Sequence, residues 1–469
     1  MKRHHKQAAK NFSGALIANF ASSFISILIL LLIPKIIGVS DYSYLQLYIF
    51  YITFVGFMHF GWADGIYLRY GGKRYDDLDK ELFSSQFWLL VIFEFIISIL
   101  FIVFAILFLN DANKILIIAL TGVNCLLMNP RVLLQLTLQS TNRILAFSKN
   151  LIVEKILYVL LISTFLFLGY GEYEYLIAAD IAAKLTMLFV LCYTCRDIVF
   201  SKMAKISVGL KEAWNSMSVG IKLMFANIAG MLTVGIVRFS IEQVWNIETF
   251  GKISLTLTVA NLVMVFISAA SVVLFPIIKR TDKANLPKIY TSLRTLLMII
   301  VLGALVIYYP AHHLLTLWLP DYTDSLIYMS LLFPICIYES KMAMLISTYL
   351  KALRKEKIIL GVNIVSVLLS IVGSIITVYW LKDLTLAILT IVAVLAIRSI
   401  IAEFILARLI GIHVKKDIAL ELLLTIIFIS TSWLIGGLLG AMLYIAAYGL
   451  YITIKKNDII KTIQLIKRS

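Results

Sequence analysis

The sequence predicts an all-α polytopic membrane protein with about 14 transmembrane helices, organised as two parallel six-helix lobes followed by two C-terminal helices. Hydrophobic residues make up 61% of the 469 residues and charged residues 14%. This composition leaves too little polar surface to cover a water-soluble globule of that length. Apolar runs of ~20 residues, enough to cross a bilayer as a helix, recur along the chain. An internal repeat with an offset of 208 residues, which places Ile33 on Ile241, relates the two halves.

Fourteen apolar runs are long enough to span a membrane. The first follows a basic start and looks like a signal peptide. It is longer than the ~7 to 15 apolar residues of such a signal, however, and no A-x-A cleavage site follows it, so we expect a retained helix. The predicted spans cover residues 12–33, 44–66, 84–109, 115–138, 148–169, 174–195, 217–240, 250–275, 289–309, 324–350, 358–379, 385–407, 418–435 and 437–454.

The first two spans form a predicted membrane hairpin. The chain leaves the first run through Pro34, turns at the polar residues 38–41, and continues as an apolar run that ends in the basic segment 69–74. This order of apolar and polar segments is typical of membrane hairpins. Residues 241–280 repeat it, and the Ala-Asn-x-Ala of residues 18–21 recurs at residues 226–229. A transporter built twice from one unit is the natural inference.

The repeat also predicts the domain organisation. Six helices in each lobe mean that the second lobe starts on the same side of the membrane as the first, so the repeats are parallel. Residues 206–214, between the lobes, have an apolar face and lysines that suit a helix at the inner interface. We therefore predict an N-terminal lobe at 1–200, an amphipathic linker at 201–216, a C-terminal lobe at 217–410, and two further helices with a basic tail at 411–469.

The basic residues predict the topology. With the N-terminus inside, the inner segments, which include residues 279–294, carry 31 of the 42 Lys and Arg residues, and the outer segments carry 4. This positive-inside bias predicts that both termini are cytoplasmic. It also accounts for the net charge of +16 without a nucleic-acid partner.

Few residues suggest enzyme chemistry, and we expect neither an enzyme nor a metal or cofactor site. All four cysteines lie in apolar spans, where Cys192 and Cys195 are expected to be packing residues and not a redox or zinc pair. The acidic residues 76–79 are flanked by Lys and Arg, which is typical of the solvated start of a helix. A membrane-embedded polysaccharide polymerase or transferase is the least favoured alternative, because the outer loops are short and poor in His, Glu and Arg.

Several helix ends resemble those of the polysaccharide flippases, which belong to the multidrug/oligosaccharidyl-lipid/polysaccharide exporter superfamily. The matching segments are Pro34–Tyr42, Gly61–Lys73, Gln139–Arg143, Gly220–Met224 and Phe275–Arg280. The resemblance implies two lobes around a central cavity and transport by alternating access. It further implies that an undecaprenyl-diphosphate-linked oligosaccharide moves from the inner to the outer leaflet of the bacterial cytoplasmic membrane.

The same resemblance implies a role in O-antigen, capsule or exopolysaccharide biosynthesis, with the lipid-linked glycan and the bilayer as partners and a polysaccharide polymerase as a candidate partner. The first predicted span carries no charge. Lipid II flippases of this superfamily carry an arginine there, so the resemblance favours the other surface polysaccharides over lipid II.

Seven basic residues remain inside predicted spans. A charged side chain in a spanning helix costs ~2.5 to 3.5 kcal/mol on insertion scales, so it normally faces a partner or a water-filled cavity. A diphosphate that crosses the bilayer needs its charge neutralised, and arginine binds phosphate bidentately. We therefore predict a cationic substrate path formed by Arg131, Arg398, Arg238, Lys184 and Lys341.

Arg131 and Arg398 are the favoured members of this path because they lie deepest in their spans. Lys184 comes one turn after Asp180 on the same helix face, so an ion pair within the helix is an equal alternative to a substrate contact.

Five carboxylates inside spans are predicted to couple transport to H⁺ or Na⁺, or to gate it: Glu339, Asp180, Glu94, Glu154 and Glu403. The 208-residue offset places Arg131 on Glu339, which suggests an ion pair between the lobes that breaks as they rock. The alternative hypothesis is that each of these two charges is neutralised within its own lobe.

A cation-coupled drug or organic-cation antiporter of the same superfamily is the first functional alternative. Such a protein would use one or two carboxylates in an apolar cavity and would not need several buried arginines. The excess of cations inside the spans therefore favours the flippase.

Overall fold

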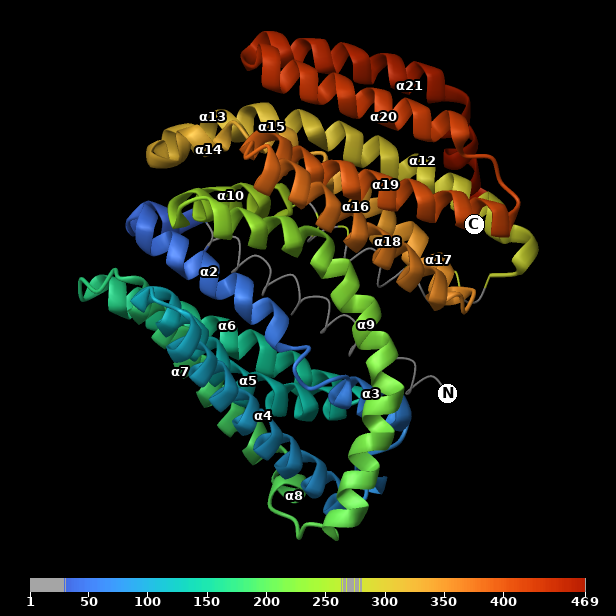
Figure 1. Ribbon diagram of the computed structural model, residues 1–469. Helices are drawn as coiled ribbons and strands as arrows, with labels where there is room; N and C mark the ends of the chain where they lie inside the picture. Colours follow the sequence, from blue (N-terminus) through green and yellow to red (C-terminus); the bar gives the residue numbers. More distant parts are fainter. Residues whose placement is uncertain are drawn as a thin grey trace. The chain divides into compact units, whose positions relative to one another are not determined.

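The computed structural model describes residues 29, 31–262, 264, 267, 274, 278 and 281–468. All regular secondary structure in these residues is helical (Figure 1). Eleven helical segments of this described part are long and apolar enough to cross a membrane, which confirms the predicted all-α, multi-pass fold. Most of the predicted span 12–33, with its Ala-Asn-x-Ala motif, and part of the predicted span 250–275 lie outside the described residues.

The chain forms two compact units, Met1–Ile228 (unit 1) and Ala229–Ser469 (unit 2). The boundary between them falls inside helix α9 (Ile206–Val244). The finer division predicted from the sequence, with a linker at 201–216, stays a prediction.

Unit 1 is built around helix α5, which packs against α2, α3, α4, α6 and α7. Its helices are α2 (Val39–Val55), α3 (Trp62–Tyr70), α4 (Lys80–Phe108), α5 (Ala112–Ser140), α6 (Ile144–Phe167), α7 (Tyr173–Thr194), α8 (Arg196–Val199) and the first part of α9, with a 3₁₀ turn at Tyr75–Asp77.

The predicted span 44–66 is divided into α2 and α3. Phe60 and Gly61 adopt positive φ angles of 50° and 79° between the two helices. A Cβ atom on Gly61 would lie 2.4 Å from the backbone nitrogen of Ile221 in α9. Glycine is therefore required here both for the left-handed conformation and for the close approach of α9.

Helices α3 and α9 touch through their backbones along this contact. A Cβ atom on Gly65 would lie 1.8 Å from the carbonyl oxygen of Ser216. One turn further along α3, Arg69 donates two hydrogen bonds to Glu212, of 2.6 and 3.1 Å. Close packing at the glycines and this ion pair together hold α3 against α9.

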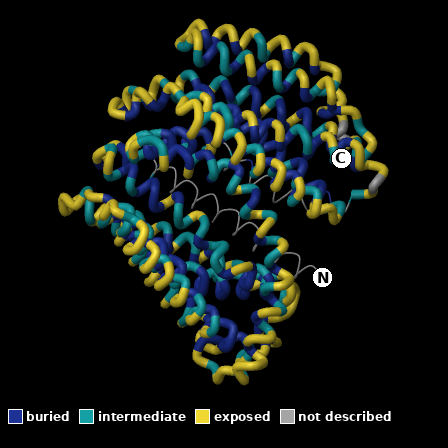
Figure 2. The backbone as a smooth tube through the Cα atoms, in the orientation of Figure 1, coloured by how far each residue is buried: buried dark blue, intermediate teal, exposed yellow. Residues whose placement is uncertain are grey.

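Helix α4 shows how the sequence separates solvent from lipid. Its first turn is capped by Asp79, which accepts a hydrogen bond of 3.0 Å from the backbone nitrogen of Leu82, as expected for a solvated helix start. Near its other end, Phe104, Leu107 and Phe108 are 51%, 70% and 69% exposed. Figure 2 shows exposed residues along the outer face of this helix, which is the face expected to contact lipid.

Unit 2 contains the rest of α9, α10 (Ile247–Ala260), α12 (Leu286–Ala304), α13 (Tyr308–Trp318), α14 (Thr323–Leu326), α15 (Met329–Leu332), α16 (Ile335–Ser340), α17 (Ser347–Ala352), α18 (Glu356–Ser374), α19 (Leu384–Ile410), α20 (Lys415–Ser430) and α21 (Gly437–Arg468). Short 3₁₀ turns occur at Lys283–Asn285, Leu305–Ile307 and Pro320–Tyr322. Three π-helical segments, Lys341–Ile346, Ile375–Trp380 and Thr431–Ile435, interrupt or end the long helices.

The internal repeat is visible in the positions where helices begin. The offset of 208 residues takes Val39, the first residue of α2, onto Ile247, the first residue of α10. The starts of α6 and α7 fall within four residues of the starts of α18 and α19. The last two predicted spans are both present as α20 and α21, and Gly436 and Gly437 between them have positive φ angles.

Candidate functional site

The predicted site residues lie in separate charge clusters, and each unit contains its own. In unit 1, Arg131 of α5 forms an ion pair with Glu154 of α6. The two residues are 6% and 8% exposed. The Nε atom of Arg131 has no hydrogen-bond partner among the described residues. Arg131 therefore combines a buried counter-charge with a donor that is available for a further anion.

A second ion pair of unit 1 lies within α7. Lys184 contacts Asp180 at 2.5 Å and donates a hydrogen bond of 2.9 Å to the side-chain oxygen of Asn124. Tyr48 of α2 donates a hydrogen bond of 2.6 Å to Asp180 and accepts one of 2.8 Å from Asn124. The ion pair within the helix, which was one of the two alternatives for Lys184, is therefore present. We call these four residues, together with Arg131 and Glu154, the unit 1 network.

Glu94 lies apart from the unit 1 network, on α4. It is 0% exposed, and neither of its carboxylate oxygens has a hydrogen-bond partner among the described residues. Its polar neighbours are Asn129 and Cys125 of α5. Both are uncharged groups, so Glu94 differs from Glu154 and Asp180, each of which has a cation beside it.

In unit 2, Arg398 of α19 joins two neighbouring helices. It contacts Glu339 of α16 at 2.9 Å, and its Nε atom donates a hydrogen bond of 3.0 Å to the side-chain oxygen of Asn363 in α18. Arg398 is 8% exposed, while the side chain of Glu339 is 26% exposed. The carboxylate end of this pair is therefore the more accessible one.

Arg238, in the second half of α9, has surroundings of a different kind. Its Nη2 atom donates a hydrogen bond of 2.9 Å to the hydroxyl of Ser254, and its guanidinium lies 5.4 Å from the centre of the Phe250 ring. Both partners belong to α10. The contacts thus hold Arg238 against a neighbouring helix of the same unit.

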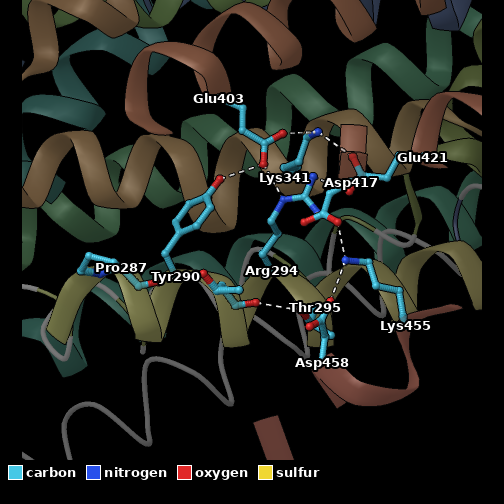
Figure 3. Close-up of polar contacts among 11 residues, drawn as sticks. Pro287, Tyr290, Arg294, Thr295, Lys341, Glu403, Asp417, Glu421, Lys455 and Asp458 are labelled. Atoms are coloured by element: carbon cyan, nitrogen blue, oxygen red, sulfur yellow. Dashed lines mark hydrogen bonds and ion pairs between the residues drawn. The ribbon is translucent and has the colours of Figure 1, made fainter. Parts of the chain in front are cut away.

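The fifth predicted cation, Lys341, belongs to a larger buried cluster of unit 2 (Figure 3). Lys341 contacts Glu403 at 2.7 Å and Glu421 at 2.9 Å. Arg294 of α12 contacts the same two carboxylates, each at 2.6 Å. These four side chains, from α12, the π-helical segment after α16, α19 and α20, are 0–3% exposed. We call them the buried quartet.

Further polar residues extend the buried quartet toward α21. Asp417 lies 3.4 Å from Arg294 and forms an ion pair with Lys455, which in turn contacts Asp458 at 2.9 Å. Tyr290 donates a hydrogen bond of 3.0 Å to Glu403. The last two helices are therefore tied to the rest of unit 2 by charge as well as by apolar packing.

Two members of the buried quartet, Arg294 and Glu421, are missing from the residues predicted from sequence. Charge counting places Arg294 in the basic inner segment 279–294, although the predicted span 289–309 also includes it. The structure assigns it to the helix core, because α12 begins at Leu286 and carries Arg294 two turns into the helix. The helical spacing around Arg294 was a sequence signal that it belongs to a buried face. That face contains Tyr290, Leu297, Met298 and Val301, all of which are buried.

The structure also bears on the two hypotheses for Arg131 and Glu339. Arg131 pairs with Glu154, and Glu339 pairs with Arg398, so each charge is neutralised inside its own unit. This is the arrangement that the alternative hypothesis expects. Among the described residues, no group of three or more His, Cys, Asp or Glu side chains could hold a metal ion.

Comparisons with known proteins identify the fold. No protein-family model matches the chain, and no curated protein sequence matches it. A structure of the lipid II flippase MurJ in an inward closed conformation matches with a TM-score of 0.63, covering 94% of this chain and 98% of that chain at 16% sequence identity.

Multidrug transporters match over a similar length. An inward-facing MATE family multidrug resistance transporter of the MOP superfamily has a TM-score of 0.63, covering 84% of this chain and 98% of that chain at 14% identity. A MATE in the straight conformation has a TM-score of 0.57, covering 87% and 96% at 12% identity. The chain therefore has a fold that it shares with these transporters.

Proposed function

We propose that the protein is a flippase that moves undecaprenyl-diphosphate-linked oligosaccharide from the inner to the outer leaflet of the bacterial cytoplasmic membrane. It would do so by alternating access, for the synthesis of a surface polysaccharide, with both termini in the cytoplasm. The fold similarity to a lipid II flippase over 94% of the chain supports a lipid-linked glycan as the substrate class. A polysaccharide polymerase is the candidate protein partner.

One observation carries this proposal. Each unit holds an arginine on a membrane-spanning helix, Arg131 or Arg398, that is at least nine-tenths buried and faces a single carboxylate. A guanidinium has five N–H donors, and one carboxylate accepts at most two of them in a parallel pair. Each arginine can therefore bind a phosphate oxygen. We assign the diphosphate contacts to these two residues first.

The carboxylates give the proposed route for coupling. Glu154, Glu339 and Asp180 each contact a cation of the predicted substrate path, namely Arg131, Arg398 and Lys184. A substrate phosphate would compete with the carboxylate for the same cation. The displaced carboxylate would then bind H⁺ or Na⁺ more readily, because an isolated negative charge in the membrane is energetically costly. The substrate phosphate would thus replace the carboxylate as partner of the cation, and the coupling ion would replace the cation as partner of the carboxylate.

The remaining predicted residues have different places in this proposal. Glu94 is the coupling candidate that could bind an ion without first losing a cation partner, because no cation lies beside it in the described part of the chain. Arg238 is held against α10 by Ser254 and the Phe250 ring, and it stays a predicted member of the substrate path. Lys341 could reach a substrate only if the buried quartet opened, so its contact with substrate is the least supported.

The test is a translocation assay in liposomes that contain a fluorescent undecaprenyl-diphosphate oligosaccharide. Arg131→Gln alone would leave Glu154 without its counter-charge, so the informative variant is Arg131→Gln/Glu154→Gln, which keeps the site neutral. We expect the double variant to fold and to lose translocation. The matched control is Arg69→Gln/Glu212→Gln, which removes an ion pair of the same type outside the proposed path. Translocation at the wild-type rate in the Arg131 double variant would refute the assignment.

A drug or organic-cation antiporter is the second candidate, because the MATE transporter reaches the same TM-score of 0.63 as the flippase. An antiporter would take up fluorescent organic cations into liposomes against a pH or sodium gradient. It would leave the lipid-linked oligosaccharide in its original leaflet. Uptake of such a cation that depends on Glu94 or Asp180, with no glycolipid movement, would replace the flippase proposal.

A further inference from the structure

A cavity of about 480 Å³ lies at the turn between α19 and α20. The turn forms because α19 ends at Gly411, whose φ angle of +72° reverses the chain direction. The backbone nitrogen of Ile412 then donates a hydrogen bond of 3.0 Å to the carbonyl of Ala407. Val414, at the start of α20, is 3% exposed and anchors the turn. The cavity is therefore part of an ordered turn.

The cavity has basic and apolar lining residues and no acidic ones. Arg408, His413 and Lys415 supply the polar part, and all three are exposed. None of them forms an ion pair with another of the described residues. Asp417, two residues beyond Lys415, is already engaged by Arg294 and Lys455. The cavity therefore carries a positive charge that the neighbouring side chains do not neutralise.

The apolar lining comes from the membrane-spanning side of the turn. Phe404 and Ile405 lie in the last two turns of α19, and Phe404 is 40% exposed. The turn joins the end of one segment that is long and apolar enough to cross a membrane, Leu384–Ile410, to the start of another, Lys415–Ile435. The cavity thus lies where hydrocarbon meets the headgroup region, with its apolar residues toward the bilayer and its cations toward water.

We propose that this cavity binds the headgroup of an anionic glycerophospholipid. Arg408 and Lys415 contact the phosphate, and an acyl chain runs along Phe404 and Ile405. Basic pockets between spanning helices are suited to this class of ligand, because cation and apolar surface are recognised together. A soluble phosphate would use only the cations, and a neutral phospholipid would use only the apolar surface. The proposal does not depend on which substrate the protein transports.

Binding at this cavity has a predicted effect on the protein. Phe404 follows Glu403 of the buried quartet directly, and Lys415 lies one helix turn or less from Asp417. A lipid that bridges the ends of α19 and α20 therefore holds the helices that carry these carboxylates. We expect phosphatidylglycerol to raise the unfolding temperature of the detergent-solubilised protein, and phosphatidylcholine to raise it less.

The direct experiment measures bound lipid by native mass spectrometry after delipidation and addition of phosphatidylglycerol or phosphatidylcholine. Each basic residue near a charged headgroup is expected to contribute about fivefold in affinity, so Arg408→Gln/Lys415→Gln should weaken phosphatidylglycerol binding about twenty-five-fold. The control, Lys351→Gln/Lys357→Gln, removes the same charge from an exposed turn of unit 2 that does not line this cavity.

Four outcomes would overturn the proposal. Equal retention of both phospholipids, or equal phosphatidylglycerol binding by the Arg408/Lys415 variant and the control, would show that the cavity does not select an anionic lipid. Displacement of the lipid by millimolar glycerol 3-phosphate would identify a soluble phosphate as the ligand. Displacement by undecaprenyl diphosphate at a much lower concentration would identify the cavity as a substrate site instead.

Discussion

The two units neutralise their membrane-embedded charges in different ways. In unit 1, Arg131 and Lys184 each face one carboxylate, and the neutral groups Asn124 and Tyr48 complete the contacts of the Lys184 pair. In unit 2, Arg294 and Lys341 share Glu403 and Glu421, so that each charge of the buried quartet has two partners. A cation with one carboxylate partner can exchange that carboxylate for a substrate phosphate. A cation held by two carboxylates resists this exchange.

The units also differ in what holds their helices together. In unit 1, α3 and α9 meet through glycine at Gly61, Gly65 and Gly220, where backbone atoms are in contact. In unit 2, charged side chains join α12, α19, α20 and α21. Unit 1 thus joins α3 to α9 by glycine packing and one ion pair and leaves Arg131 and Lys184 with one carboxylate each, whereas unit 2 uses many of its charges to join helices. Arg398, outside the buried quartet, is the exception that resembles Arg131.

The largest expected effect concerns the buried quartet. Glu421→Gln leaves Arg294 and Lys341 with an excess positive charge at sites that are 0–3% exposed. We expect a loss of about 3–5 kcal/mol in the free energy of unfolding, since breaking a buried ion pair leaves an uncompensated charge. Denaturant unfolding in detergent micelles measures this loss. Lys341→Met/Glu421→Gln, which removes one charge of each sign, should be clearly more stable than the single variant.

If Glu421→Gln and the double variant unfolded at the same denaturant concentration, charge balance would not be what stabilises unit 2. The contrast between the units would then rest on packing alone.

A smaller effect is expected from glycine packing in unit 1. Gly65→Ala places a methyl group 1.8 Å from the Ser216 carbonyl oxygen and must push α3 away from α9. We expect a destabilisation of about 1–3 kcal/mol, as for other overpacked cores. The matched control is Gly361→Ala in α18 of unit 2, where a Cβ would have no heavy atom within 4 Å. That variant should be unchanged or more stable by about 0.5–1 kcal/mol, and a similar loss in both variants would argue against backbone contact in unit 1.

The smallest effect compares two tyrosines that each donate a hydrogen bond to a carboxylate. Tyr290→Phe removes a donor from Glu403, whose side chain is 0% exposed, and should cost about 1.5–3 kcal/mol. Tyr48→Phe removes a donor from Asp180, whose side chain is 17% exposed and retains Lys184, and should cost about 1 kcal/mol or less. Thermal unfolding of the two variants side by side measures the difference. The reverse order would contradict the view that unit 1 is the more adaptable one.

Only part of the fold and of the charge pairing could be predicted from the sequence alone. Hydropathy and loop charge were enough to locate the eleven long apolar helical segments of the described residues, because both depend on composition within a short window. The pair between Asp180 and Lys184 was predictable for the same reason, since its members are four residues apart. The break between α2 and α3 was not, because the close approach of Ile221 to Gly61 arises from residues far apart in the chain.

The buried quartet could not be predicted from sequence spacing. Arg294 is separated from Glu403 by 109 residues and from its other partners by more, so no local pattern connects them. A lysine or arginine near a helix end also has the same local sequence whether it faces solvent or a buried carboxylate. Charge counting for that reason places Arg294 with the basic inner segment 279–294. The buried face formed by Tyr290, Met298 and Val301 was the available indication that it belongs to the core.

The most direct test of the account compares transport in two neutralised variants. Arg131→Gln/Glu154→Gln removes an arginine proposed to bind the diphosphate, and Lys341→Met/Glu421→Gln removes a pair proposed to be structural. The initial rate of translocation of labelled undecaprenyl-diphosphate oligosaccharide is measured in liposomes and divided by the amount of folded protein. We predict that the first variant loses at least about tenfold, the effect of one lost charge-assisted contact of about 1.4 kcal/mol, while the second stays near the wild-type rate. Loss of transport in the second variant with a normal rate in the first would contradict the account.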